Sequence, residues 1–122
     1  MIKEAYCNPE IAELLKEKGM DKECFTHYIQ KNNGDGTSEA VTTCTQQMAM
    51  RWLRKVHKLY VTILYSKLLY GNKPFYWYIE RLNKKPVDEK FVKTSTATEE
   101  YTYRTYEQAI EAAIRYSLKN LI

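Results

Sequence analysis

Five side chains of the kinds that bind metals or act as nucleophiles are spread along this sequence: Cys7, Cys24, His27, Cys44 and His57. Structural zinc sites take pairs of ligands two to five residues apart, and only Cys24 with His27 has such a spacing. One pair supplies two of the four ligands that zinc needs, so we expect no metal site. Cysteine is commonly a small buried apolar residue, and we expect the three thiols to be free.

Catalytic patterns are also missing. The chain contains none of the sequence motifs of serine hydrolases, zinc proteases, nucleotide hydrolases or dinucleotide-binding enzymes. The Gly34–Gly36 stretch is too short and too turn-like to hold a phosphate. A catalytic pairing of Cys24 with His57 stays open, because the sequence does not give their separation. We therefore expect a protein that is not an enzyme and that uses no cofactor.

A basic stripe beside aromatic residues is the feature that favours binding. Four cations repeat at helical spacing just before a predicted strand, and three tyrosines share one face of that strand and the next. Cations hold anionic groups, and a tyrosine offers a flat apolar face together with a hydroxyl. The candidate binding residues are Arg51, Arg54, Lys55, Lys58, Tyr60, Tyr76 and Tyr78.

These residues favour a non-enzymatic binding protein that associates with a protein partner or with itself, as a homodimer. If helices cover only the opposite face of the sheet, the tyrosine-bearing face is too apolar to remain in water. Another helix, or the Leu68–Tyr70 segment, is the alternative cover for that face. The alternative function is the binding of nucleic acid or a nucleotide, since cations hold phosphates and aromatic rings stack on bases.

Charge is distributed unevenly along the chain. Between Arg51 and Lys93 there are eleven Lys or Arg and three Asp or Glu, whereas the whole chain has a net charge of +4. The middle is therefore basic and the two ends are acidic. This asymmetry indicates an anionic partner, or it indicates that the acidic ends pack beside the basic middle and neutralise it.

Size and composition predict one globular domain over residues 1–122. The chain has 44% hydrophobic and 28% charged residues, which is typical of a folded protein. Its first residues lack the apolar core of a signal peptide, and no apolar run approaches the ~20 residues of a membrane span. Free thiols and these absences predict a cytoplasmic protein that does not associate with membranes.

The expected elements begin with a short helix after Asn8, a favoured N-cap, that ends near Gly19. A hairpin follows, with strands over Cys24–Lys31 and Ser38–Thr42. Thr43 or Thr45 then caps a helix over Gln46–Lys58. Its apolar stripe, Ala49, Trp52, Leu53 and Val56, predicts Trp52 as an anchor in the core.

Two strong strands are expected over Leu59–Ser66 and Phe75–Leu82, then a loop at Lys84–Pro86 and a weaker strand over Lys90–Ala97. The last helix starts after Thr105 and keeps one apolar face for four turns. The predicted class is α+β, in the order α-β-β-α-β-β-(β)-α. We expect an antiparallel sheet of three to five strands, with helices packed mainly on one face.

Two blocks of the sequence resemble a known group of proteins. They run from Thr45 to Arg54, followed by His57, and from Thr105 to Ile122, and together they cover about a quarter of the chain. Both resemble blocks of a family of small uncharacterised proteins of Bacteroides-type bacteria and their phages or mobile elements. The resemblance implies an accessory gene and a bacterial or viral cytoplasm, and it carries no catalytic residues with it.

Overall fold

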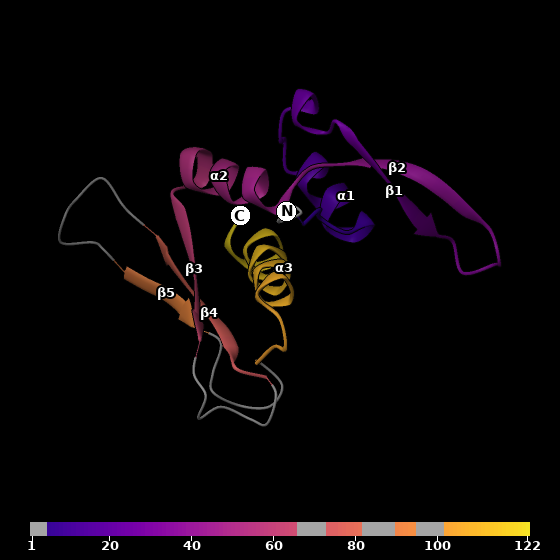
Figure 1. The fold of residues 1–122 in the computed structure, drawn as a ribbon. Coiled ribbons are helices and arrows are strands. Elements are labelled where there is room, and N and C mark those ends of the chain that lie inside the picture. The colour runs from indigo at the N-terminus through magenta and orange to yellow at the C-terminus, as the bar shows by residue number, and fades with distance from the viewer. Residues whose placement is uncertain (1–4, 66–72, 82–89, 95–101) are drawn as a thin grey trace.

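The fold is described from a computed structural model, which describes residues 5–65, 73–81, 90–94 and 102–122 (Figure 1). The elements follow the order α1, η1, β1, β2, α2, β3, β4, β5, α3. The α+β class is confirmed. The strands divide into two antiparallel sheets, a β1–β2 hairpin and a three-stranded sheet in the order β3-β4-β5, so they do not all share the single sheet that was expected.

The N-terminal part consists of a helix and the hairpin. Helix α1 (Pro9–Glu17) starts at Asn8, whose side chain accepts a hydrogen bond from the amide of Ile11. A 3-10 turn, η1 (Lys22–Cys24), leads into β1 (His27–Asn32), which pairs with β2 (Ser38–Thr43). Gly34 and Gly36 have positive φ in the connecting turn, a conformation that glycine adopts without steric cost.

Helix α2 (Gln46–His57) is capped by Thr45, whose hydroxyl accepts from the amide of Met48 at 3.1 Å. Thr43, the other candidate cap, instead donates its hydroxyl proton to the carbonyl of Cys7 at 2.7 Å. Thr45 therefore pairs with one of the free amides at the start of α2. Thr43 instead connects β2 to the segment that precedes α1.

The face of α2 that enters the core differs from the predicted one. The residues that α2 buries are Gln46, Ala49, Met50 and Leu53, at the spacing i, i+3, i+4, i+7. Trp52 is partly buried and packs against the edge of the core cluster, and Val56 is 57% exposed. The Trp52 side of the predicted stripe therefore lies at the margin of the core and not at its centre. Both stripes contain Ala49 and Leu53, and the true one is rotated toward Met50.

The second sheet contains β3 (Leu59–Tyr65), β4 (Phe75–Arg81) and β5 (Lys90–Thr94). Strands β3 and β4 pair in register along their whole length, from Leu59 opposite Arg81 to Tyr65 opposite Phe75. Trp77 and Ile79 are buried on one face, where the Trp77 ring lies 5.2 Å from that of Tyr116 in the last helix. The alternating residues of β3 and β4 occupy the other face.

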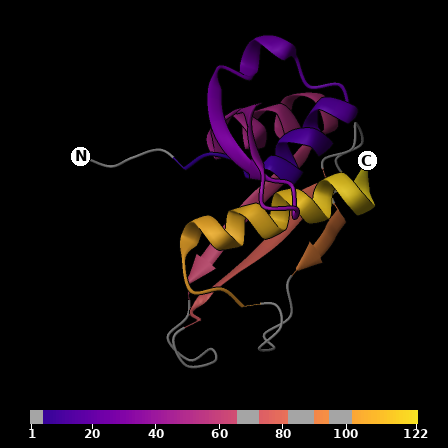
Figure 2. The ribbon, with the colours of Figure 1, turned by 90° about the vertical axis from the view of Figure 1, so that its right-hand side faces the viewer.

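Helix α3 (Tyr106–Tyr116) connects the two parts of the molecule. It starts at Thr105, whose hydroxyl accepts from the amide of Gln108, and it continues into a π-helical turn at Ser117–Leu121. In Figures 1 and 2, α3 runs across β3 and β4 on one side and contacts α1 and α2 on the other. Its predicted apolar face is confirmed over six buried residues: Ala109, Ile110, Ala113, Ile114, Ser117 and Leu118.

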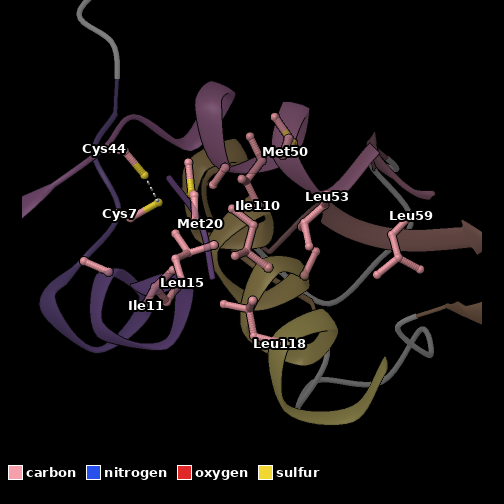
Figure 3. Close-up of a cluster of buried hydrophobic side chains, with 14 of the residues drawn as sticks. Cys7, Ile11, Leu15, Met20, Cys44, Met50, Leu53, Leu59, Ile110 and Leu118 are labelled. Carbon is pink, nitrogen blue, oxygen red and sulfur yellow. Dashed lines mark hydrogen bonds between the residues drawn. The ribbon is translucent and has the colours of Figure 1, made fainter. Parts of the chain in front are cut away.

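One hydrophobic core spans these elements (Figure 3). Ile11 and Leu15 of α1, Leu53 of α2 and Ile110 of α3 are all at most 1% exposed and belong to the same cluster. The predicted loop at Lys84–Pro86, the Leu68–Tyr70 segment and the last part of the weak strand lie outside the described residues. In the part of the chain that is described, no helix combines the length and apolar character that a membrane crossing requires.

Candidate functional site

The outer surface of α2 carries two adjoining hollows, which we call the α2 groove. The first has a volume of about 240 Å³ and is lined by Cys24, Met48, Arg51, Trp52, Lys55 and Val56. The second, of about 310 Å³, is lined by His27, Thr45, Gln47, Met48, Arg51 and Arg54. Met48 and Arg51 line both hollows. The 3-10 turn and the start of β1 contribute one residue to each, Cys24 and His27.

The rotation of α2 explains why this groove exists. Because the fully buried residues of the helix include Met50 and Leu53, the Trp52 indole is only partly buried and the Val56 isopropyl group lies at the surface. The Trp52 ring meets the His57 ring edge-on, with 4.7 Å between their centroids. The apolar part of the groove therefore has cations next to it, Arg51 and Lys55, on the same solvent-facing side of the helix.

No ion pair among the described residues involves the cations of the groove. The ion pairs there join Lys31 to Glu13, Arg115 and Lys119 to Glu10, and Arg115 to Glu111. All of these acids and bases belong to the N- and C-terminal parts of the chain. The acidic ends of the protein thus pair with their own bases, and the alternative in which they neutralise the basic middle has no support in these residues.

Lys58 has a different role from the other three cations. It follows the last residue of α2 in the left-handed conformation, with φ of 58°, and its amide donates to the carbonyl of Leu53. Its ammonium group donates to the carbonyl of Lys55 at 3.1 Å. A cation at the C-terminal end of a helix is stabilised by the helix dipole. Lys58 therefore ends the helix and does not line the groove.

The three candidate tyrosines lie on another surface. Tyr60 belongs to β3, and Tyr76 and Tyr78 belong to β4. Their positions alternate with those of the residues that pack against α3, so the three tyrosines lie on the opposite face of the sheet. Tyr60 is 37% exposed, and the other two are partly buried. None of the three lines either hollow of the groove. Self-association through the tyrosine-bearing face stays a prediction.

Cys24, one of the two residues considered for catalysis, has a thiol that holds its proton. Burial raises the pKa of the Cys24 thiol; Asp21, Cys44 and Glu23 act in the same direction, and only Arg51 opposes them. A thiol with a raised pKa is a poor nucleophile at neutral pH, because the thiolate is the reactive form. Within the described residues, no three His, Cys, Asp or Glu side chains come close enough together to hold a metal ion.

A hollow of about 670 Å³ at the C-terminal end of α1 is a second candidate. Its one well-placed cation, Lys16, donates to both the carbonyl and the hydroxyl of Thr42, at 2.9 and 2.8 Å. The same ammonium lies 5.0 Å from the centre of the Phe25 ring. Lys16 therefore joins α1 to β2 and to Phe25, which lies between η1 and β1, and its ammonium group is already engaged by groups of the protein.

Sequence reasoning found the cations of the groove and missed its apolar part. Met48, Trp52 and Val56 are separated by four residues each, which places them on one line along the helix. That spacing is visible in the sequence, and so is the competing stripe that contains Met50.

Comparison of the chain with protein-family models, with curated proteins and with solved structures finds no match.

Proposed function

We propose that this protein is a non-enzymatic binding protein whose α2 groove binds an acidic, partly apolar segment of a protein partner. The observation that carries the proposal is the combination in one groove of Arg51, Arg54 and Lys55 with the partly buried Trp52. Tryptophan and arginine are the residue types that contribute most often to the energetic centres of protein interfaces.

A protein partner fits the groove better than a nucleic acid does. Proteins that bind single strands combine cations with aromatic rings on which the bases stack. The tyrosines that suit stacking are on the sheet and not in the groove, and the Trp52 ring is already packed against the His57 ring. A carboxylate beside a leucine-like side chain matches what the groove offers, a guanidinium next to an apolar hollow.

The resemblance of the Thr45–Arg54 block to proteins of bacterial and phage accessory genomes is compatible with such a role. We infer that the partner is a cytoplasmic protein of the host cell or of the same mobile element. The block contains Arg51, Arg54 and Met48, which line the groove, so the resembling stretch and the proposed binding surface coincide.

A polarisation titration tests the proposal. The probe is a short fluorescein-labelled peptide of Glu, Leu and Phe, and the proteins are the wild type and the Arg51→Ala/Arg54→Ala/Lys55→Ala variant. Exposed ion pairs contribute about 0.2–1 kcal/mol each, and a tenfold change in affinity corresponds to about 1.4 kcal/mol. We expect the variant, which loses three cations, to bind the peptide roughly 3–150-fold more weakly.

The matched control removes the same charge from other surfaces. Lys18, Lys22 and Arg104 are exposed and lie outside α2, so Lys18→Ala/Lys22→Ala/Arg104→Ala should bind the peptide like the wild type. Equal losses in both triple variants would mean that only net charge matters and would contradict a specific groove. The nucleic-acid alternative would be favoured if a labelled thymidine oligonucleotide bound the wild type more tightly than the peptide does. This oligonucleotide binding would have to be lost in Arg51→Ala/Arg54→Ala/Lys55→Ala and kept in the control variant.

A further inference from the structure

Two of the three cysteines lie side by side in the core. The sulfur atoms of Cys7 and Cys44 are 4.0 Å apart, and both residues are completely buried (Figure 3). They come from distant parts of the sequence, one just before α1 and the other just before α2. Nothing in the proposed binding function uses them, because neither lines the α2 groove.

The backbone holds these two cysteines opposite each other. Tyr6 and Thr45 form an antiparallel bridge, and the amide of Cys7 donates to the carbonyl of Cys44 at 2.9 Å. Directly opposite residues of antiparallel segments have Cβ atoms about 4.5–5.5 Å apart. A disulfide spans a Cβ separation of about 3.5–4.5 Å, so a small approach of the two segments suffices. Rotation about χ1 of either cysteine moves its sulfur over the remaining distance.

We propose that Cys7 and Cys44 form a redox-modification site, at which a low-molecular-weight disulfide such as oxidised glutathione converts the two thiols to an intramolecular disulfide. Each cysteine directly precedes the cap of a helix, Asn8 for α1 and Thr45 for α2. The new bond therefore joins the starts of these two helices covalently. This property is separate from the binding proposed for the α2 groove.

The two sulfurs have different roles in the exchange. The neighbouring Cys7 S–H group lowers the pKa of Cys44, and the ammonium of Lys16 acts in the same direction against the effect of burial. The Cys7 thiol, with its pKa raised by Cys44 and by burial, keeps its proton longer. Cys44 is thus the thiol that reacts first, since the thiolate is the attacking species.

The electrons and protons balance in two steps. The Cys44 thiolate attacks one sulfur of oxidised glutathione, forms a mixed disulfide and releases one glutathione thiolate, which takes up a proton. Cys7 then loses its proton and attacks the Cys44 sulfur, and the second glutathione leaves as its thiol. In total the two protein thiols give two electrons to the glutathione disulfide, which is reduced to two thiols.

A reagent reaches this pair through local opening of the segment before α1. That segment is connected to residues 43–46 by two backbone hydrogen bonds, from Cys7 to Cys44 and from Gln46 to Ala5, and by the bond from the Thr43 hydroxyl to the Cys7 carbonyl. Short segments held by few hydrogen bonds open far more often than the whole domain unfolds. The buried position slows the reaction and does not prevent it.

Peptide mapping of the full chain tests the proposal. Trypsin places each cysteine in its own peptide: Cys7 in residues 4–16, Cys24 in residues 23–31 and Cys44 in residues 32–51. The protein is equilibrated with oxidised glutathione, free thiols are alkylated, and the digest is analysed without reduction. We expect peptide 4–16 linked to peptide 32–51, with loss of both unlinked peptides and their return after treatment with dithiothreitol.

The variants give matched outcomes. Cys24→Ser should form the same link as the wild type, and Cys7→Ser and Cys44→Ser should not form it. The wild-type map does not depend on whether those two variants fold. A link that contains residues 23–31, a disulfide between two molecules, or three alkylated thiols after oxidation would each overturn the proposal.

Discussion

Replacement of Leu53 by alanine is expected to lower the free energy of unfolding by about 2–5 kcal/mol. Leu53 lies on the inner face of α2, is 0% exposed and belongs to the main core cluster. Removing its branched side chain loses the transfer free energy of the deleted atoms and leaves a cavity, because the surrounding side chains relax only in part. Urea unfolding followed by circular dichroism measures the change.

Val56 provides the matched control on the same helix. It is one turn further along and 57% exposed, so Val56→Ala should change the free energy of unfolding by no more than about 0.5 kcal/mol. The two variants together determine which face of α2 is buried. If Val56→Ala destabilised the protein as much as Leu53→Ala, the helix would be rotated toward the stripe expected from the sequence, and the α2 groove would not exist.

The second large effect is expected at Ile110 in α3. This residue is 1% exposed and shares a cluster with Ile11 of α1 and Leu53 of α2 (Figure 3). Because α3 packs on the sheet on one side and on α1 and α2 on the other, a cavity at this position weakens contacts between both parts of the molecule. Ile110→Ala should cost about 2–5 kcal/mol.

Gln108 is the control for that variant. It is exposed on the same helix, and only its amide, not its side chain, takes part in the Thr105 cap. Gln108→Ala should leave the stability unchanged or raise it slightly, because alanine has the higher helix propensity. Thermal unfolding of both variants, followed with probes of helix content and of tryptophan environment, measures the effects. Two separate transitions in the wild type would contradict one shared core.

The sequence predicted the structure correctly where a residue pattern was compatible with one conformation and one buried face. Helix α3 has a threonine cap and an apolar face that repeats without a competing stripe, and the structure contains both features as expected. The β3 and β4 segments are rich in aromatic and β-branched residues, and the two strands pair in register. In these elements local preference and burial favour the same conformation, which makes prediction from sequence reliable.

The prediction from sequence failed where two apolar stripes of one helix were almost equally suited to burial. On α2, the stripe with Trp52 and the stripe with Met50 overlap at Ala49 and Leu53, and a tryptophan is the more obvious core residue. The choice depends on the shape of the surface that α3 and β3 present to α2, which no local pattern contains. The same limit applied to the cysteines, because the bridge that places Cys7 beside Cys44 is a long-range contact.

The orientation of α2 explains why apolar and basic residues lie together in the α2 groove. Burial of Met50 and Leu53 leaves Trp52 only partly buried, and Arg51 and Lys55 line the same hollow as its ring. Three of the four predicted basic residues line the groove, and the tyrosines belong to another face. A binding surface of this composition recognises acidic and apolar groups together.

The emission of Trp52 tests this account most directly. The chain has two tryptophans, and the Trp77→Phe variant leaves Trp52 as the only indole, excited beyond the tyrosine absorption. In the free protein we predict emission typical of a partly exposed indole that acrylamide quenches, and with the Glu, Leu and Phe peptide a blue shift with loss of quenching. Peptide binding that leaves Trp52 emission and quenching unchanged would contradict the account, because the segment would then bind elsewhere.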